Sequence, residues 1–272
     1  MNKITTITSR QNKLFPDLKE LYSYRQLLFS LALRDIKVKY AQTYIGILWA
    51  FINPVFNLLV LSFVFGVVAK VNTNGLPQLL FTIAGLSAWT YFSTLLTEAG
   101  NSIVGAQNMI KKIYFPRLVI PLSKALSGLI DLGVTLICLI ILMMYYKTLP
   151  GVQIIYLPLF VLLAIICGLA GGILISALSA RYRDFSYVVP MLVRLGLYIT
   201  PVAYSANSIP EKYKIFYYLN PMAGIVEGFR WSLFGSESPD QYMIISIVVA
   251  LMLFVASLIY FAKIEHKLAD II

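Results

Sequence analysis

The sequence predicts an all-α integral membrane protein with about six transmembrane helices, and three observations support this class. Of the 272 residues, 59% are hydrophobic and only 12% are charged, whereas about a quarter of the residues in soluble domains are charged. The hydrophobic residues fall in long blocks rather than amphipathic stripes, which is typical of helices that cross lipid. The net charge of +10 is the third observation, because cytoplasmic loops of membrane proteins are rich in Lys and Arg.

The N-terminal segment 1–44 is polar and basic, without the apolar core and cleavage site of a signal peptide. We expect it to be a retained cytoplasmic segment. It contains apolar residues at roughly helical spacing among basic ones, namely Leu21, Tyr24, Leu28, Leu31 and Ile36. This pattern predicts an N-terminal amphipathic interface helix, since a basic amphipathic helix before a span is typical of the membrane surface. An ordinary cytosolic helix is the alternative.

The rest of the chain divides into apolar segments separated by polar turns such as Pro150-Gly151. The predicted spans are about 45–69, 78–103, 118–146, 154–180, 185–204 and 241–262. Within the first span, Pro54 predicts a kink. Gly168 and Gly172 in the fourth span have the spacing of close helix packing.

The segment 208–234 is less regular than the six spans. Its two apolar pieces flank Asn220-Pro221, and neither reaches the ~20 residues needed to cross a membrane. We therefore expect external re-entrant half-helices at about 208–234.

The positions of the basic residues predict the orientation of the chain. Sixteen of the 22 Lys and Arg residues fall in segments 1–44, 105–124, 181–186 and 263–272, and five lie in the segments on the opposite side. This asymmetry predicts that both termini, including the tail 263–272, are cytoplasmic. Because topology explains the basic charge, nucleic acid is not an expected partner.

The cytoplasmic loop between the second and third spans is a candidate docking element. Residues 106–116 can form about two turns of helix that Pro116 ends. The candidate docking residues are Asn108, Met109, Ile110, Lys111, Lys112, Tyr114 and Phe115. A short helix of this kind can dock in a groove of a soluble partner, and a plain loop with topological lysines is the alternative.

Ionisable residues are rare within the predicted spans. Asp131 and Arg194 lie at similar depths in the third and fifth spans, so we expect them to form an intramembrane ion pair. Four aromatic residues are candidates for lining a channel, because aromatic rings stack against sugars: Tyr91, Phe92, Tyr198 and Tyr204. Membrane-interface belts account for many of the other aromatic residues.

The sequence contains no Gly-x-x-x-x-Gly-Lys-Ser/Thr motif for binding ATP phosphates. Cys138 and Cys167 fall inside apolar blocks and are expected to pack as small hydrophobic residues. No cluster of metal ligands and no nucleophile with a neighbouring base is evident. We therefore expect no catalytic, cofactor-binding or metal-binding residues, and a protein that is not itself an enzyme.

Six runs, in order along most of the chain, resemble the membrane subunit of type-2 ABC exporters, in the branch that exports polysaccharides and polyol phosphates. The runs are 33–50, Asn53-Pro54, 114–117, 181–185, 198–204 and 219–222. The resemblance implies a homodimer with a channel between the copies and two ATPase subunits that bind ATP and Mg. It also implies that the loop at 106–116 is the ATPase-coupling helix and that the half-helices are gating elements.

The expected cargo is a lipid-linked glycan (O-antigen, capsule or teichoic acid) crossing the cytoplasmic (inner) membrane of a bacterium. One alternative is an exporter of the same type for a drug or small lipid. An ion-coupled secondary transporter is a second alternative, although it predicts inverted repeats, and no convincing repeat is evident. A membrane scaffold without transport activity is the third.

Overall fold

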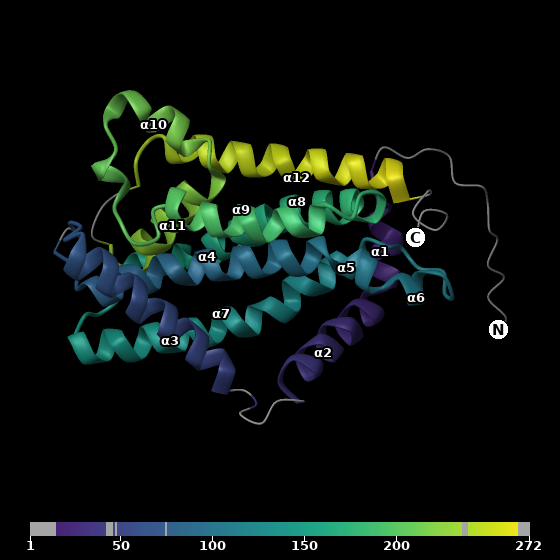
Figure 1. Cartoon of the computed structure of the whole chain (residues 1–272), viewed down its shortest axis with the longest axis horizontal. Helices are drawn as coiled ribbons and strands as arrows, with labels where there is room; N and C mark the ends of the chain where they lie inside the picture. Colours follow the sequence, from purple (N-terminus) through teal and green to yellow (C-terminus); the bar gives the residue numbers. More distant parts are fainter. Residues whose placement is uncertain (1–14, 42–45, 47, 74, 236–238, 266–272) are drawn as a thin grey trace.

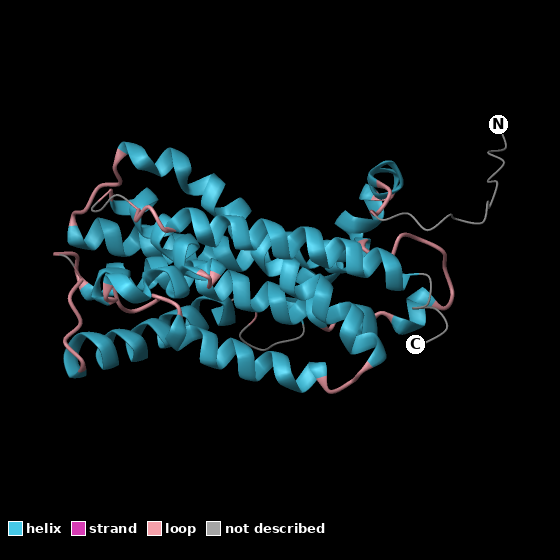
Figure 2. Cartoon of the chain, turned by 90° about the horizontal axis from the view of Figure 1, so that it is seen from above, coloured by secondary structure: helices cyan, strands magenta, loops and turns pink. Residues whose placement is uncertain are grey.

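The computed structural model describes residues 15–41, 46, 48–73, 75–235 and 239–265. Every regular element within these ranges is a helix, and the long helices run side by side (Figure 1; Figure 2). The predicted all-α membrane class is therefore confirmed. Parts of the predicted cytoplasmic segments, including 1–14 and 266–272, lie outside the described residues.

Five helices are long and apolar enough to cross a membrane. They are α3 (Leu48–Ser62, continued by a π-helical turn at Phe63–Val68), α4 (Gln78–Gly100), α7 (Val119–Tyr146), α8 (Leu157–Arg181, after a 3-10 turn at Val152–Tyr156) and α12 (Met243–Glu265). Each lies within a predicted span or extends it by a few residues. The helix α3 contains Pro54.

The sixth apolar helix, α9 (Phe185–Ile199), is shorter than the predicted span 185–204. Its 15 residues give a length of about 22 Å, against ~30 Å for the hydrocarbon core of a bilayer. The helix ends because Pro201 follows Thr200, which has extended backbone angles, and the residue before a proline disfavours the helical region. Six complete spans therefore stay a prediction.

Helices α4 and α8 pack closely at the centre of the bundle. A Cβ atom at Gly172 would lie 2.6 Å from that of Ala99, and one at Gly168 would lie 2.8 Å from the Leu95 side chain. The close packing predicted from the glycine spacing is thus confirmed. Helix α12 packs on α8, α7 packs on α4, and α3 and α9 both contact α4.

Helices α1 (Leu18–Ser23) and α2 (Arg25–Ala41) precede the bundle, and α2 packs against α7. Leu31 of the predicted apolar stripe is buried, and Leu21, Tyr24 and Leu28 pack against the core. A second set of apolar side chains on α2 is exposed, namely Phe29, Leu33 and Val38. The stripe therefore faces the protein, and the position of α2 at the membrane surface stays a prediction.

Helices α10 (Glu211–Tyr218) and α11 (Pro221–Phe234) lie at the opposite end of the bundle from α1, α5 (Ser102–Gly105) and α6 (Gln107–Ile110) (Figure 1). Following the predicted orientation, the end with α1, α5 and α6 is called the cytoplasmic end, and the other the external end. The sequence dictates the limits of α11, because Asn220 caps its first turn and Gly235 ends it with a positive φ of 62°. Helix α11 packs among α4, α8 and α12.

Candidate functional site

The helix in the predicted docking loop is shorter than the predicted 106–116. Helix α6 has only four residues, Gln107–Ile110, and turns follow it. Pro116 disfavours helical backbone angles at Phe115, and the helix ends five residues before that position, at Ile110. The loop is therefore a single helical turn followed by an irregular segment.

Burial divides the seven candidate docking residues into two groups. Ile110 and Phe115 are buried in the core and Met109 packs against it, so these three anchor the loop. The exposed residues are Asn108, Lys111, Lys112 and Tyr114, together with the neighbouring Ile113. We call these five residues the cytoplasmic loop surface.

Two neighbouring elements hold the cytoplasmic loop surface in place. The backbone N–H of Arg117 donates a hydrogen bond of 3.0 Å to Oε1 of Glu265, and its guanidinium donates to the Glu265 carbonyl oxygen. The hydroxyl of Tyr114 donates to Oε1 of Glu20 at 3.3 Å. The loop is thus tied both to the last turn of α12 and to α1.

Asp131 has different partners from the one predicted. Its carboxylate lies 2.6 Å from Nζ of Lys39 and accepts a hydrogen bond from the Tyr40 hydroxyl, while Lys39 also lies 3.4 Å from Glu98. Arg194 is exposed on α9, and the described residues show no contact between it and Asp131. The predicted Asp131–Arg194 pair is wrong within one chain, because α2 rather than α9 packs beside α7.

A second ion pair joins α2 to α7. Nζ of Lys124 lies 2.6 Å from Oδ2 of Asp35, and both side chains are largely buried. Burial by itself raises the pKa of Asp35, but the hydrogen bonds from Lys124 and Arg34 outweigh it, so the pKa is lower than usual. These side chains line a cavity of about 230 Å³ between α2, α4 and α7.

The cytoplasmic half of α4 carries a polar stripe. Between Thr90 and Asn101, every position that keeps some exposure is polar except Phe92. The members of the stripe are Thr90, Ser93, Thr94, Thr97, Glu98 and Asn101, the last of which directly follows the end of α4 at Gly100. Spacings of three and four residues place most of them on one face of the helix. A polar face of this kind on a membrane-spanning helix is typical of a water-accessible path.

The four aromatic candidates have different surroundings. Tyr91 is buried and donates a hydrogen bond of 3.0 Å to the carbonyl oxygen of Ala125, so it cannot line a channel in this conformation. Phe92 is partly buried, with its ring 5.3 Å from that of Trp89. Tyr198 is exposed and remains a candidate. The Tyr204 hydroxyl instead donates to the carbonyl oxygen of Ile199 at 2.7 Å, which caps the end of α9.

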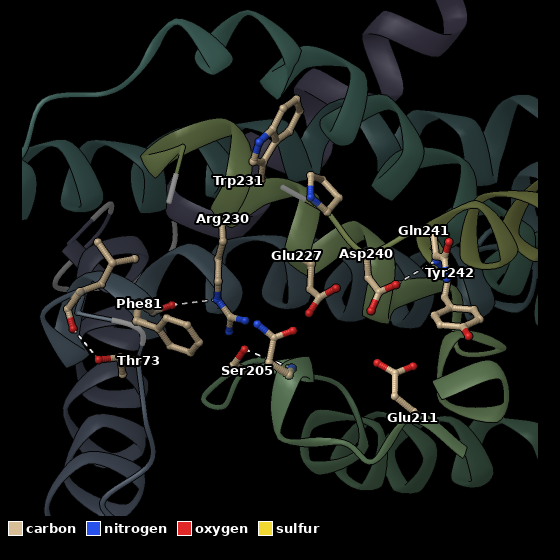
Figure 3. Close-up of a pocket in the computed structure, with 13 residues that line it drawn as sticks. Thr73, Phe81, Ser205, Glu211, Glu227, Arg230, Trp231, Asp240, Gln241 and Tyr242 are labelled. Atoms are coloured by element: carbon tan, nitrogen blue, oxygen red, sulfur yellow. Dashed lines mark hydrogen bonds between the residues drawn. The ribbon is translucent and has the colours of Figure 1, made fainter. Parts of the chain in front are cut away.

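Arg230 on α11 is the only buried charged side chain among the described residues. Its guanidinium donates hydrogen bonds to four backbone carbonyl oxygens, those of Phe81, Pro201, Val202 and Tyr204. It also lies 3.7 Å from the centre of the Phe81 ring. A buried cation loses its hydration, and these carbonyl oxygens and this ring compensate for that loss. Figure 3 shows the side chain pointing from α11 toward Phe81.

Arg230 is one of the five basic residues in the segments predicted to be external, and its burial was not predicted. The signal that could have found it is its position inside the apolar piece 223–234, between Phe229 and Trp231. A lone cation within an apolar helix is usually turned toward partners inside the protein.

A polar cavity of about 400 Å³ lies beside Arg230 at the external end (Figure 3). Glu227 lines it and accepts a hydrogen bond from the Tyr218 hydroxyl. Lys214 of α10 bridges Glu211 and Asp240 at 2.8 and 2.7 Å. Within the described residues, His, Cys, Asp and Glu form no group that could hold a metal ion.

Comparison with known proteins gives one family and several full-length relatives. The ABC-2 type transporter family profile matches residues 26–234. The chain is 29% identical over 253 residues to an O-antigen export system permease of Myxococcus xanthus, an alignment covering 92% of this chain and 96% of the relative. A permease of the same description from Klebsiella pneumoniae is 28% identical, with coverages of 90% and 95%. A capsule polysaccharide export inner-membrane protein of Neisseria meningitidis is 22% identical, also with coverages of 90% and 95%.

Proposed function

Because this chain belongs to the ABC-2 type transporter family, we propose that it is the membrane subunit of an exporter for a lipid-linked polysaccharide. The observation that carries the proposal is the alignment with O-antigen permeases over nine-tenths or more of both chains. The direction of transport is outward across a cytoplasmic membrane, with both termini inside. The long apolar helices supply the membrane-spanning part.

The energy comes from a separate ATPase. The sequence has no phosphate-binding motif of its own. As the family resemblance implies, two ATPase subunits bind the ATP and Mg that drive two copies of this chain. The cytoplasmic loop surface is where each ATPase docks, with Lys111, Lys112 and Tyr114 as the contacting residues. The hydrogen bonds from Arg117 to α12 and from Tyr114 to α1 allow a movement of the loop to be transmitted to both helices.

The conduit lies between two copies of the chain and includes the polar stripe of α4. Hydroxyl and amide groups exchange hydrogen bonds with sugar hydroxyls at little net cost, so such a surface passes a glycan without holding it tightly. Helices α3 and α9, which both contact α4, expose large apolar side chains such as Phe56 and Met191. These side chains suit contact with lipid or with the second copy.

A pull-down and an export measurement test the docking. We expect Lys111→Ala combined with Lys112→Ala to reduce co-purification of the co-expressed ATPase and to reduce glycan export by about tenfold or more, since each lost charged contact is worth about 1–3 kcal/mol. The matched control is Lys212→Ala, which removes an exposed cation from α10 at the external end. We expect it to leave both the co-purification and the export unchanged. Export by the chain alone in vesicles without any ATPase would contradict the proposal.

A drug or small-lipid exporter of the same family is the competing function. Deleting the gene for this chain distinguishes the two functions. If the chain exports a polysaccharide, lipid-linked glycan accumulates in the cytoplasmic leaflet of the deletion strain. If it exports a drug, the glycan at the cell surface is unchanged.

A further inference from the structure

Helix α9 is little buried along its length; the short segment 182–184 joins it to α8 at one end, and a buried turn follows it at the other. Of its 15 residues, only Val189 is buried, whereas 15 of the 23 residues of α4 are. The residues that follow α9 are different, because Thr200, Val202 and Ala203 are all buried. An exposed helix therefore leads directly into a turn that is fixed in the core.

The fixed turn, residues 200–204, is held by hydrogen bonds from outside α9. Arg230 holds three of its carbonyl oxygens, those of Pro201, Val202 and Tyr204. The side-chain amide of Asn220 donates to Oγ1 of Thr200 at 2.9 Å. Both Arg230 and Asn220 belong to α11 and its cap, so α11 anchors the end of α9.

The turn also lies against α4 at a glycine. A Cβ atom at Gly85 would lie 2.6 Å from the carbonyl oxygen of Val202 and 2.7 Å from Nη2 of Arg230. One turn before the end of α9, a Cβ at Gly196 would lie 2.6 Å from the Trp89 ring. At the external end, both the turn and the last turn of α9 therefore lie close against α4.

We propose that residues 200–204 form a pivot, and that Arg230 is the positioning residue that holds it while the cytoplasmic end of α9 swings. Tyr187 lies about 18 Å from Ile199 along the helix, so a rotation of about 15° moves it by about 5 Å. The pivot itself stays in place. The pivot rests on the proposed function in one respect, namely that the ATPase drives the movement of α9.

An arginine suits this position better than a lysine. Its planar guanidinium presents five N–H donors in a fixed fork, which serves several carbonyl oxygens and the Phe81 ring at once. A lysine keeps the charge and has three donors on one atom. Arg230→Lys therefore holds the turn loosely while keeping the buried cation.

Spin-label distances in the full complex test the pivot. Tyr187→Cys and, separately, Ile199→Cys are paired with Tyr145→Cys on α7, in chains whose buried Cys138 and Cys167 are replaced by alanine. All three labelled sites are exposed. Doubly labelled chains are diluted with unlabelled ones so that distances within one chain are measured, with and without ATP and vanadate.

We expect trapping to shift the Tyr187 distance by several ångströms and to leave the Ile199 distance unchanged. In Arg230→Lys we expect the Ile199 distribution to broaden, whereas Arg194→Gln, the matched control on α9, leaves it unchanged. An Ile199 shift as large as that of Tyr187, no shift at either site, or an unchanged Ile199 distribution in Arg230→Lys overturns the pivot. Co-purification of the ATPase in the same samples reports separately on the proposed function.

Discussion

Positive charges hold together both ends of the bundle, but their surroundings differ. At the cytoplasmic end, Lys39 pairs with Asp131, and 42% of the Lys39 side chain remains exposed. At the external end, Arg230 is 7% exposed and is bound to backbone carbonyl oxygens. The first is a pair of side chains that is partly exposed through Lys39, and the second is a single cation inside the protein.

The difference predicts which of the two interactions breaks more easily when the protein changes conformation. Water and salt compete for an exposed ion pair, so breaking it costs about 1 kcal/mol or less. Water cannot replace the partners of a buried cation, so breaking its hydrogen bonds leaves unpaired buried groups at a high cost in free energy. The contact between Lys39 and Asp131 is therefore the easier of the two to break, and it lies on the side where the ATPase is proposed to dock.

The largest effect is expected for Arg230→Gln. The shorter neutral amide cannot reach four carbonyl oxygens, so buried acceptors are left without donors. We expect a loss of about 3–5 kcal/mol in the free energy of unfolding, the cost of breaking a buried charged interaction. Thermal unfolding of the purified protein in detergent measures it, and a melting temperature equal to that of the wild type would contradict the comparison.

Gly85→Ala tests the same end without touching the charge. The new methyl group would collide with the Val202 carbonyl oxygen and with Arg230, so the turn must move. Overpacking of this kind costs about 1–3 kcal/mol. Gly133→Ala on α7 is the control, because its methyl group meets no atom within 4 Å. Equal melting temperatures for the two variants would show that the turn yields easily.

The sequence predicts the long helices because a span needs only length and apolar composition, as for α7 and α12. It predicts close helix packing at Gly168 and Gly172 of α8, but not that α4 is the partner. It does not predict the partners of charged residues. Asp131 and Arg194 match in depth, but depth along a helix does not say which neighbour packs beside it, and α2 supplies Lys39 instead.

The external end was harder to predict for a related reason. Arg230 depends on oxygens from α4 and from the turn after α9, which are 26 or more residues away in sequence. Backbone carbonyls carry no sequence signature, so no pattern identifies them as partners. Tyr204 was predicted to line a channel because aromatic rings stack against sugars. In the structure its hydroxyl donates a hydrogen bond that caps the end of α9.

Asp35→Asn is expected to have an intermediate effect, because the pair with Lys124 is more buried than the other cytoplasmic pairs. We expect a loss of about 1–2 kcal/mol, between exposed and buried pairs. The folded-state pKa of Asp35 is lowered, so this stability is present above pH 3.8 and is lost as the pH falls below it. Acid titrations of unfolding should show a smaller loss in Asp35→Asn than in the wild type.

A charge swap tests the more exposed pair of Lys39 and Asp131. We expect Lys39→Asp and Asp131→Lys each to cost about 1 kcal/mol or less from the lost pair, plus a similar amount from repulsion between like charges. The double variant restores the opposite charges and should recover much of the loss. A double variant no better than the sum of the two single variants would show that the two residues act independently.

The smallest effect is expected for Arg194→Gln, although it makes the same chemical change as Arg230→Gln. Arg194 is exposed on α9 and lies apart from the buried turn, so its removal leaves no buried group without a partner. Exposed substitutions of this kind change stability by about 0.5 kcal/mol or less. Thermal unfolding of the two variants side by side checks the comparison directly. A loss for Arg194→Gln as large as that for Arg230→Gln would contradict the comparison, because the exposed and the buried arginine would then contribute equally.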